Sequence, residues 1–276
     1  MAFTPQNRIN RAERRSNTSM FWRSMRAVLL ACALCALLGG CANAADASAS
    51  GTGSLAASDA LMASDDLSYE LPENPIDFKA LQEQNSDVYA WIYVPGTEVN
   101  SPVLQSSPDD EDFYLTHDIH GDESDVGCIY SQLVNSKEFT DPVTLLYGHT
   151  FEAWQNDLKD EAFGTLHNFE DADFFADHDI FYIYLPGKVL TYKIVSAYEY
   201  DDRHIIDSFD FEKRAVLQQY YDYVVNPDST LKNVREGMTL TADKDRIVQL
   251  STCTRPDKFT ARYLVTGVLV DEQKTK

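Results

Sequence analysis

Short hydrophobic runs bounded by turn residues recur along the chain from about residue 88 to residue 270. They are rich in β-branched and aromatic residues, and several alternate apolar with polar positions, which is typical of strands. The predicted strands are residues 88–94, 99–105, 127–130, 143–147, 180–185, 188–200, 246–253 and 260–270. Strands in this number, with few helices between them, exclude an alternating doubly wound sheet. We therefore expect a mainly β fold, a closed or nearly closed barrel of about eight strands.

Three segments with helical spacing interrupt these strands. Residues 76–84 predict a short helix before the first strand, and residues 161–176 predict one or two more. The clearest helix is 211–225, whose apolar residues share one broad face and whose start could be capped by Ser208 or Asp210. It comes before the strand 246–253, so we expect an insertion that covers the barrel, a common place for a wall of a substrate site.

The N-terminal segment has the layout of an export signal. A basic flank at 8–26 precedes an apolar run at 27–38, followed by small residues around Cys41. Three interpretations stay open: an uncleaved membrane anchor, a lipoprotein signal acylated at Cys41, or a signal cleaved near residues 42–44. Each places the rest of the chain outside the membrane. We divide the chain into an export segment (1–41), a flexible tether rich in Ala, Ser and Gly (42–66) and one globular domain (67–276).

Charge narrows the range of partners. The 276 residues carry 23 Lys and Arg against 44 Asp and Glu, a net charge of −21. Beyond residue 40 the balance is 17 basic against 43 acidic residues. A surface this acidic excludes nucleic acid as a partner, because binding a phosphate backbone requires basic residues. It also excludes binding of the globular part to anionic lipid through a cluster of basic residues. Contact with a membrane is therefore expected only through the N-terminal segment.

Cysteine usage leaves two possibilities for the globular part, in which Cys128 and Cys253 are the only cysteines. An exported protein could join them in a disulfide. Alternatively, Cys253 is a free thiol kept for its chemistry, since it ends a strand-like run and precedes a cluster of turn residues. A nucleophilic thiol needs a base nearby. Of the six histidines, His149 follows the strand 143–147 and so lies at the same kind of strand end.

An arginine could complete such a site. If the last two strands pair across a hairpin loop at 254–259, Arg262 faces Cys253 to within about two positions. A guanidinium there could stabilise a thiolate or the oxyanion of a tetrahedral intermediate. Arg255 is its rival, expected on the loop. His167 and His178 are expected at the surface, beside helices.

These residues together resemble a known family. Leu-Ser-Thr-Cys at 250–253, Tyr-Gly-His at 147–149 and Arg262, nine residues after the cysteine, resemble the sortases. Residues 87–105, with their Trp-Ile and Pro-Val pairs, and the helix before the cysteine strand are similar to class B. The family usually has Thr where this chain has Gln249, and we expect this departure to have little consequence.

The resemblance implies a sortase β-barrel with an N-terminal helix and a helix inserted before the cysteine strand. It implies a cysteine transpeptidase that cleaves a sorting signal near the C-terminus of secreted proteins through a thioacyl-enzyme. The acyl group then passes to an amine of a peptidoglycan precursor or of a pilin. No cofactor and no metal are implied, and the expected location is the cell membrane, with the catalytic domain outside.

The resemblance also assigns roles. Cys253 is the expected nucleophile, His149 the general acid and base, and Arg262 the group that stabilises the oxyanion and positions the peptide. Thr252 and Ser251 are expected to contact substrate. These roles argue against a disulfide between Cys128 and Cys253.

Two other classes of protein remain as alternatives. One is a different exported cysteine peptidase, although a papain-like enzyme would have its cysteine at the start of a helix and its histidine far downstream. Here Cys253 ends a strand and His149 lies 104 residues upstream. The other is a non-catalytic surface lipoprotein or binding module, suggested by Cys41 and by the acidity.

Overall fold

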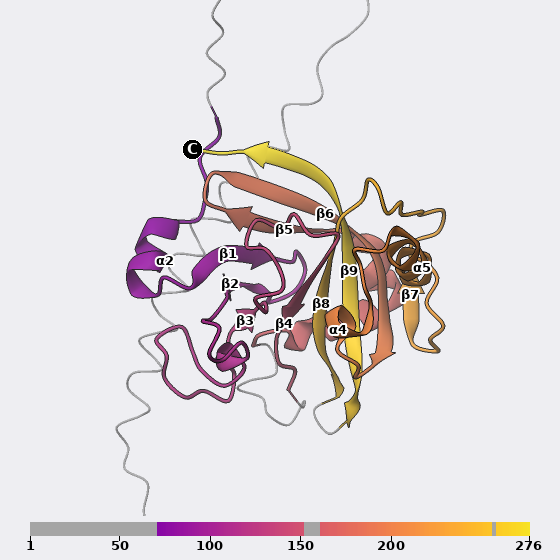
Figure 1. Cartoon of the computed structure of the whole chain (residues 1–276), viewed down its shortest axis with the longest axis horizontal. Coiled ribbons are helices and arrows are strands. Elements are labelled where there is room, and N and C mark those ends of the chain that lie inside the picture. The colour runs from indigo at the N-terminus through magenta and orange to yellow at the C-terminus, as the bar shows by residue number, and fades with distance from the viewer. Residues whose placement is uncertain (1–70, 152–160, 256–257) are drawn as a thin grey trace, which may run out of the picture. The chain divides into compact units, whose positions relative to one another are not determined.

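The computed structural model describes residues 71–151, 161–255 and 258–276 (Figure 1). All of them fall in one compact unit, Asp66–Lys276. The export segment 1–41 and the tether 42–66 lie outside the described residues, so the division of the chain stays a prediction. Among the residues described, no helix is both long enough and apolar enough to cross a bilayer.

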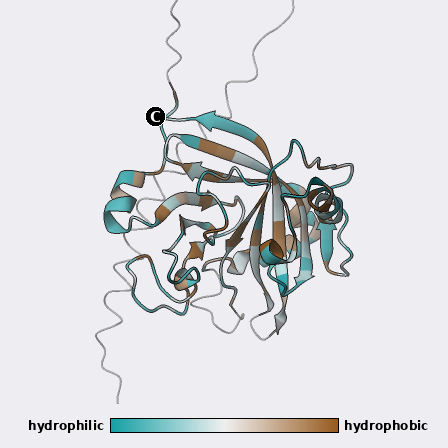
Figure 2. Ribbon diagram, in the orientation of Figure 1, coloured by the Kyte–Doolittle hydropathy of each residue, from teal (hydrophilic) through white to brown (hydrophobic). Residues whose placement is uncertain are grey.

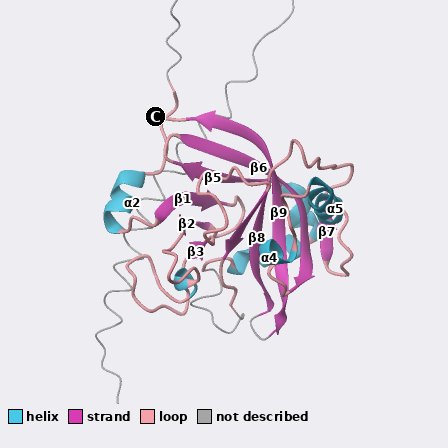
Figure 3. Cartoon of the chain, in the orientation of Figure 1, coloured by secondary structure: helices cyan, strands magenta, loops and turns pink. Residues whose placement is uncertain are grey.

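Strands dominate the described part of the chain (Figure 3). In chain order they are β1 Val88–Tyr93, β2 Asn100–Leu104, β3 Ile129–Tyr130, β4 Val143–Tyr147, β5 Ile180–Leu185, β6 Lys188–Asp201, β7 Lys232–Val234, β8 Ile247–Arg255 and β9 Lys258–Lys274. They pair in the order β5-β1-β2-β3-β4-β8-β9-β6-β7, and β5 also pairs with β6. That last pairing closes eight strands into a barrel and leaves β7 outside it. The predicted barrel of about eight strands is confirmed, and β7, a three-residue strand, was not predicted.

Strand alternation fills the barrel interior. In β5 the side chains of Phe181, Ile183 and Leu185 are buried and the residues between them are less so. Val248 and Leu250 of β8 join the same interior cluster, because successive strand residues point to opposite faces. Replacing such a buried residue by alanine typically costs about 2–5 kcal/mol. Figure 2 shows apolar residues along the barrel strands and hydrophilic residues in α2 and at the C-terminal end of β9.

Helices cover only part of the barrel. They are α2 Phe78–Gln84, α3 Ala172–Asp177, α4 Ile205–Ser208 and α5 Arg214–Val224, with 3-10 helices η2 Phe113–Leu115 and η3 Gly164–Glu170. The N-terminal helix and the helix before the cysteine strand are thus confirmed. Helix α5 buries Leu217, Tyr220, Tyr221 and Val224, a spacing that puts all four on one face. They form a second core on the outer side of the barrel, with Leu145 and Leu264 among others.

The predicted start of the longest helix was wrong. Helix α5 begins at Arg214, and its N-cap Lys213 makes no side-chain capping bond. Ser208 is the last residue of α4. The Asp210 carboxylate lies 2.8 Å from the Lys213 ammonium and accepts from the backbone N–H groups of Glu212 and Lys213, which precede the helix. An apolar residue at 211 extends the periodic pattern past the true helix end, which explains the error.

Candidate active site

Cys253 lies near the end of β8, on the face that points out of the barrel. Val248 and Leu250 face the interior, whereas Ile247 contributes to the outer core. Alternation therefore puts Cys253 on the outer face with Ile247 and Ser251. Its thiol is half-buried and not in a disulfide. A partly exposed thiol at a strand end is accessible to a peptide that lies across the barrel.

Arg262 is the direct partner of Cys253 in the antiparallel pairing of β8 with β9. Residues opposite each other in such a pair lie about 5 Å apart and project to the same face. Burial raises the pKa of Tyr130 and Tyr147 above its ordinary value, and the Arg262 guanidinium opposes that rise. The guanidinium therefore acts on the same outer face as the cysteine. The prediction that Arg262 faces Cys253 is confirmed.

The hairpin between these strands differs from the prediction. Strand β8 continues to Arg255 and β9 begins at Lys258, and these two residues are paired. Arg255 therefore lies on a strand and not on a loop of six residues. The register shifts between Cys253 and Arg255, which separates Arg255 from the regular ladder that holds Arg262.

His149 reaches the same level as Cys253 from the neighbouring strand. Strands β4 and β8 run parallel, with Tyr147 opposite Ser251, so residues two positions further along correspond to His149 and Cys253. Gly148 continues the pairing, since its N–H donates to the Ser251 carbonyl at 3.2 Å. A side chain at Gly148 would meet the Phe163 ring at 2.8 Å. Figure 1 shows β4, β8 and β9 as neighbours in the barrel.

The His149 ring is held by the backbone of a distant loop. Its Nε2 lies 2.8 Å from the carbonyl oxygen of Leu115, and a carbonyl only accepts hydrogen bonds. Nε2 is therefore the protonated nitrogen in this geometry, and Nδ1 is the nitrogen whose proton can be gained or lost. The backbone carbonyl of His149 accepts a hydrogen bond from the Phe163 N–H at 2.9 Å. The first contact orients the imidazole, and the second holds the backbone that carries it.

Sequence reasoning missed His167. It lies in η3, and its Nε2 is 3.1 Å from the carbonyl oxygen of Cys253. Its Nδ1 is 2.7 Å from a carboxylate oxygen of Glu170, and the ring stacks on Tyr263 at 4.9 Å. The side chain is 22% exposed, so His167 lies partly at the surface, as expected, but its contact with the Cys253 backbone was not predicted. No periodicity links residues 86 positions apart, so the sequence held no signal for this contact.

Ser251 and Thr252, the predicted substrate contacts, face opposite ways. Ser251 is buried on the face of Cys253, next to β4. Thr252 pairs with Tyr263, an interior residue, and its hydroxyl is buried with no hydrogen-bond partner among the described residues. The Thr252 side chain therefore points away from the face that bears Cys253.

Cys128 does not have the environment of a nucleophile. Burial, together with the charge of Asp118, raises the pKa of its thiol to about 12, so at neutral pH it stays protonated. Neither it nor Cys253 forms a disulfide. Within the described residues, no group of three or more His, Cys, Asp or Glu side chains gathers as a metal site would require.

Gln249, where the family usually has Thr, is part of a buried network. Its side-chain oxygen accepts from the Tyr220 hydroxyl at 2.6 Å, and its amide donates to the Thr266 hydroxyl at 3.0 Å. Tyr220 belongs to α5, so the amide ties the inserted helix to the barrel two residues before Ser251. The Gln249 side chain thus helps to hold α5 in place beside the site.

Comparisons with known proteins identify the family. The Sortase domain family matches residues 92–270. Sortase B of Listeria monocytogenes is 29% identical over 196 residues, which cover 70% of this chain and 74% of that protein. Sortase B of Staphylococcus aureus is 28% identical over 190 residues, covering 68% of this chain and 72% of that protein.

Solved structures give the same result. The crystal structure of Clostridium perfringens sortase B is similar with a TM-score of 0.58 and 28% identity, covering 70% of this chain and all of that one. A Staphylococcus aureus sortase B–substrate complex has a TM-score of 0.59 and 26% identity, covering 70% of this chain and 84% of the other. Neither alternative, another type of cysteine peptidase or a non-catalytic binding module, gains support. The chain belongs to the sortase family of cysteine transpeptidases, and within it to class B.

Proposed function

We propose that this sortase performs its transpeptidation with Cys253, His149 and Arg262. The observation that carries the proposal is a single row across three adjacent strands: His149 just beyond β4, Cys253 on β8 and Arg262 on β9. Ladder hydrogen bonds on both sides of β8 fix the backbone positions. Catalytic groups need to be held to within about 0.5 Å, and strand residues meet that demand better than loop residues do.

In the first half of the reaction Cys253, as thiolate, attacks the backbone carbonyl carbon of a sorting signal. Arg262 donates to the oxyanion of the tetrahedral intermediate, the type of contact that is worth about 2.7–4 kcal/mol in other enzymes. The C–N bond then breaks, and the leaving amine takes a proton from Nδ1 of His149. The product is a thioester between the acyl fragment and Cys253, and His149 is left neutral.

In the second half an amine attacks the thioester carbonyl. Neutral His149 takes the amine proton, the new amide bond forms, the C–S bond breaks and sulfur leaves as the thiolate. The bond from Nε2 to the Leu115 carbonyl supports this role, because it leaves Nδ1 to exchange the proton in both halves. Ser251 and the backbone N–H of Thr252 are the proposed neighbours of the bound peptide.

The acceptor and the location are part of the proposal. We assign the acceptor amine to a peptidoglycan precursor or to a pilin lysine. We place the catalytic domain outside the cell, held by one N-terminal anchor, with acylation of Cys41 as the alternative form of attachment. The apolar run and the basic flank of residues 1–41 support this location. Mass analysis of the N-terminal peptide from the membrane fraction tests it. A chain recovered without residues 1–41 and without lipid would contradict it.

Product analysis tests the reaction. The full chain is incubated with a panel of sorting peptides and an amine, and the products are identified by mass. We expect one peptide to be cut and its N-terminal part to be joined to the amine. Cys253→Ala is expected to abolish cleavage and transfer, whereas Cys128→Ala is expected to keep both. Loss of activity in both variants, or in neither, would contradict the proposed site.

A further inference from the structure

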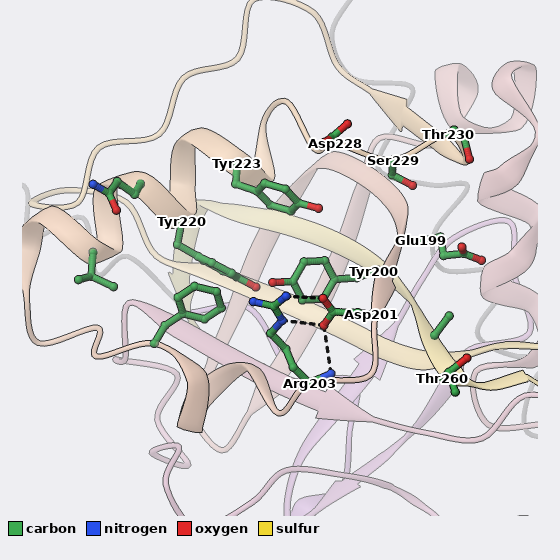
Figure 4. Close-up of a pocket in the computed structure, with 14 residues that line it drawn as sticks. Glu199, Tyr200, Asp201, Arg203, Tyr220, Tyr223, Asp228, Ser229, Thr230 and Thr260 are labelled. Atoms are coloured by element: carbon green, nitrogen blue, oxygen red, sulfur yellow. Dashed lines mark hydrogen bonds and ion pairs between the residues drawn. The ribbon is translucent and has the colours of Figure 1, made fainter.

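A cavity of about 740 Å³ opens on the outer face beside α5 (Figure 4). Its floor is the C-terminal end of β6, and α5 forms one wall. It does not include Cys253, His149 or Arg262, but it starts next to them. Tyr200, which lines it, is the cross-strand partner of Arg262, and Arg262 is the partner of Cys253. Two strand spacings, roughly 10 Å, therefore separate the backbone of Cys253 from the cavity floor.

Aromatic rings and carboxylates line this cavity. Tyr200 and Tyr223 meet edge to face at 5.6 Å, with Tyr220 beside them. Among the described residues that line it, the carboxylates of Asp201 and Asp228 outnumber the one guanidinium, that of Arg203. The lining therefore carries an excess of negative charge next to π-faces, which is the environment that attracts an organic cation.

The pKa of Tyr223 shows that the carboxylates of Asp228 and Asp201 lie close to its hydroxyl. Burial raises the pKa of its hydroxyl, and the charges of Asp228 and Asp201 raise it further, while Arg203 opposes them. Figure 4 shows the Tyr223 ring extending from α5 over Tyr200. The Tyr223 hydroxyl therefore lies within the field of both carboxylates.

One cation of the chain already uses this chemistry. The Arg203 guanidinium lies 5.4 Å from the centre of the Tyr200 ring, and its Nε donates to the Asp201 carboxylate at 2.7 Å. It neutralises Asp201 and covers one aromatic face. Tyr223, on α5, and Asp228, on the segment after that helix, line another part of the cavity. The cavity thus binds the guanidinium of Arg203 through one ring and one carboxylate. The Asp228 carboxylate and the Tyr223 ring could bind a cation from outside the chain in the same way.

We propose that the cavity binds a positively charged side group of the acceptor while the acceptor's attacking amine reaches the thioester at Cys253. This inference rests on the proposed function. The cation in the cavity is not the attacking amine itself, because the floor lies two strands away from Cys253. The preferred acceptor is therefore a peptide with two cationic groups separated by about 10 Å. The attacking amine forms the amide and loses its proton to His149, and the second ammonium stays charged in the cavity.

Two matched acceptors test the inference. The lysine acceptor is Gly-Gly-Lys amide with its side-chain nitrogen trimethylated, and the control is Gly-Gly-norleucine amide. Both have the same single nucleophilic amine, at the N-terminus, and only the first carries a second, permanent charge. With the full chain and a saturating sorting peptide, we expect the KM for the lysine acceptor to be about fivefold lower, the size of one cation–π or carboxylate contact. Equal KM values would overturn the inference.

Variants assign the effect to the cavity. Asp228→Asn is expected to remove the preference for lysine and to leave cleavage of the sorting peptide unchanged. Glu236→Gln changes the charge equally at an exposed position outside the cavity and is expected to keep the preference. Arg203→Gln, which frees Asp201, is expected to increase it. A preference that survives in Asp228→Asn, or that Glu236→Gln also removes, would overturn the assignment.

The same experiment separates the two proposals. Cleavage of the sorting peptide is measured without any acceptor, as release of its C-terminal fragment. An enzyme that cleaves the peptide but transfers to both acceptors equally contradicts the cavity inference alone. An enzyme that cleaves no peptide of the panel contradicts the proposed function, and the cavity inference with it.

Discussion

Cys253 and Arg262 are direct cross-strand partners at the end of the β8–β9 hairpin. The pairing places the thiol and the guanidinium on one face, with His149 on the other side of the cysteine. The three side chains come from positions 149, 253 and 262, and the parallel pairing of β4 with β8 brings the first of them to the other two.

The first prediction separates Arg262 from Arg255. Arg262→Ala is expected to reduce the rate of transfer at least a hundredfold, because a fixed oxyanion donor contributes about 2.7–4 kcal/mol. Arg262→Lys is expected to recover little, since the planar fork is lost. Arg255→Ala is expected to lose less than tenfold, because Arg255 lies beyond the register shift and opposite Lys258. Steady-state rates decide between them, and a larger loss at Arg255 would reverse the assignment.

The second prediction concerns Gln249 and Tyr220. Gln249→Thr restores the residue usual in the family but leaves the Tyr220 hydroxyl without its 2.6 Å acceptor. The free energy of unfolding is expected to fall by about 1–3 kcal/mol, the usual cost of an unsatisfied buried polar group. Tyr220→Phe in the same background is expected to cost less than it does in the parent chain. Urea unfolding of the four proteins measures this coupling, and strictly additive losses would show that the bond contributes nothing.

The sequence predicted the fold better than the fine geometry of the site. Strand limits at 143–147 and 180–185 match β4 and β5 residue for residue, because alternation and turn residues are local signals. The short strand β7 was not predicted, because three residues are too few to show a periodic pattern. Contacts of His149 with the Leu115 carbonyl and of His167 with the Cys253 carbonyl join distant segments through backbone oxygens. Backbone oxygens have no sequence signature, so these contacts could not be predicted.

The third prediction concerns Cys128 and pH. Its folded pKa of about 12 lies above the ordinary value of 9.0, so folding favours the protonated thiol. The stability that this thiol contributes is fully present below pH 9 and is lost as the pH rises from 9 towards 12. The loss is at most about 1.4 kcal/mol per pH unit. Unfolding free energies of the parent chain and of Cys128→Ala are therefore expected to converge over pH 9 to 10, and tyrosine ionisation, which is common to both proteins, cancels in the difference. A constant difference across that range would contradict the raised pKa.

The most direct test of the central claim is the site of the thioacyl intermediate. The full chain is mixed with a cleavable sorting peptide in the absence of amine, quenched in acid, digested and mapped by mass. We predict an adduct equal to the N-terminal peptide fragment on the segment that contains Cys253, and accumulation of that adduct in Arg262→Lys is expected to be slower. No adduct is expected in Cys253→Ala. An adduct on Cys128, or continued cleavage by Cys253→Ala, would contradict the assignment of Cys253 as the nucleophile.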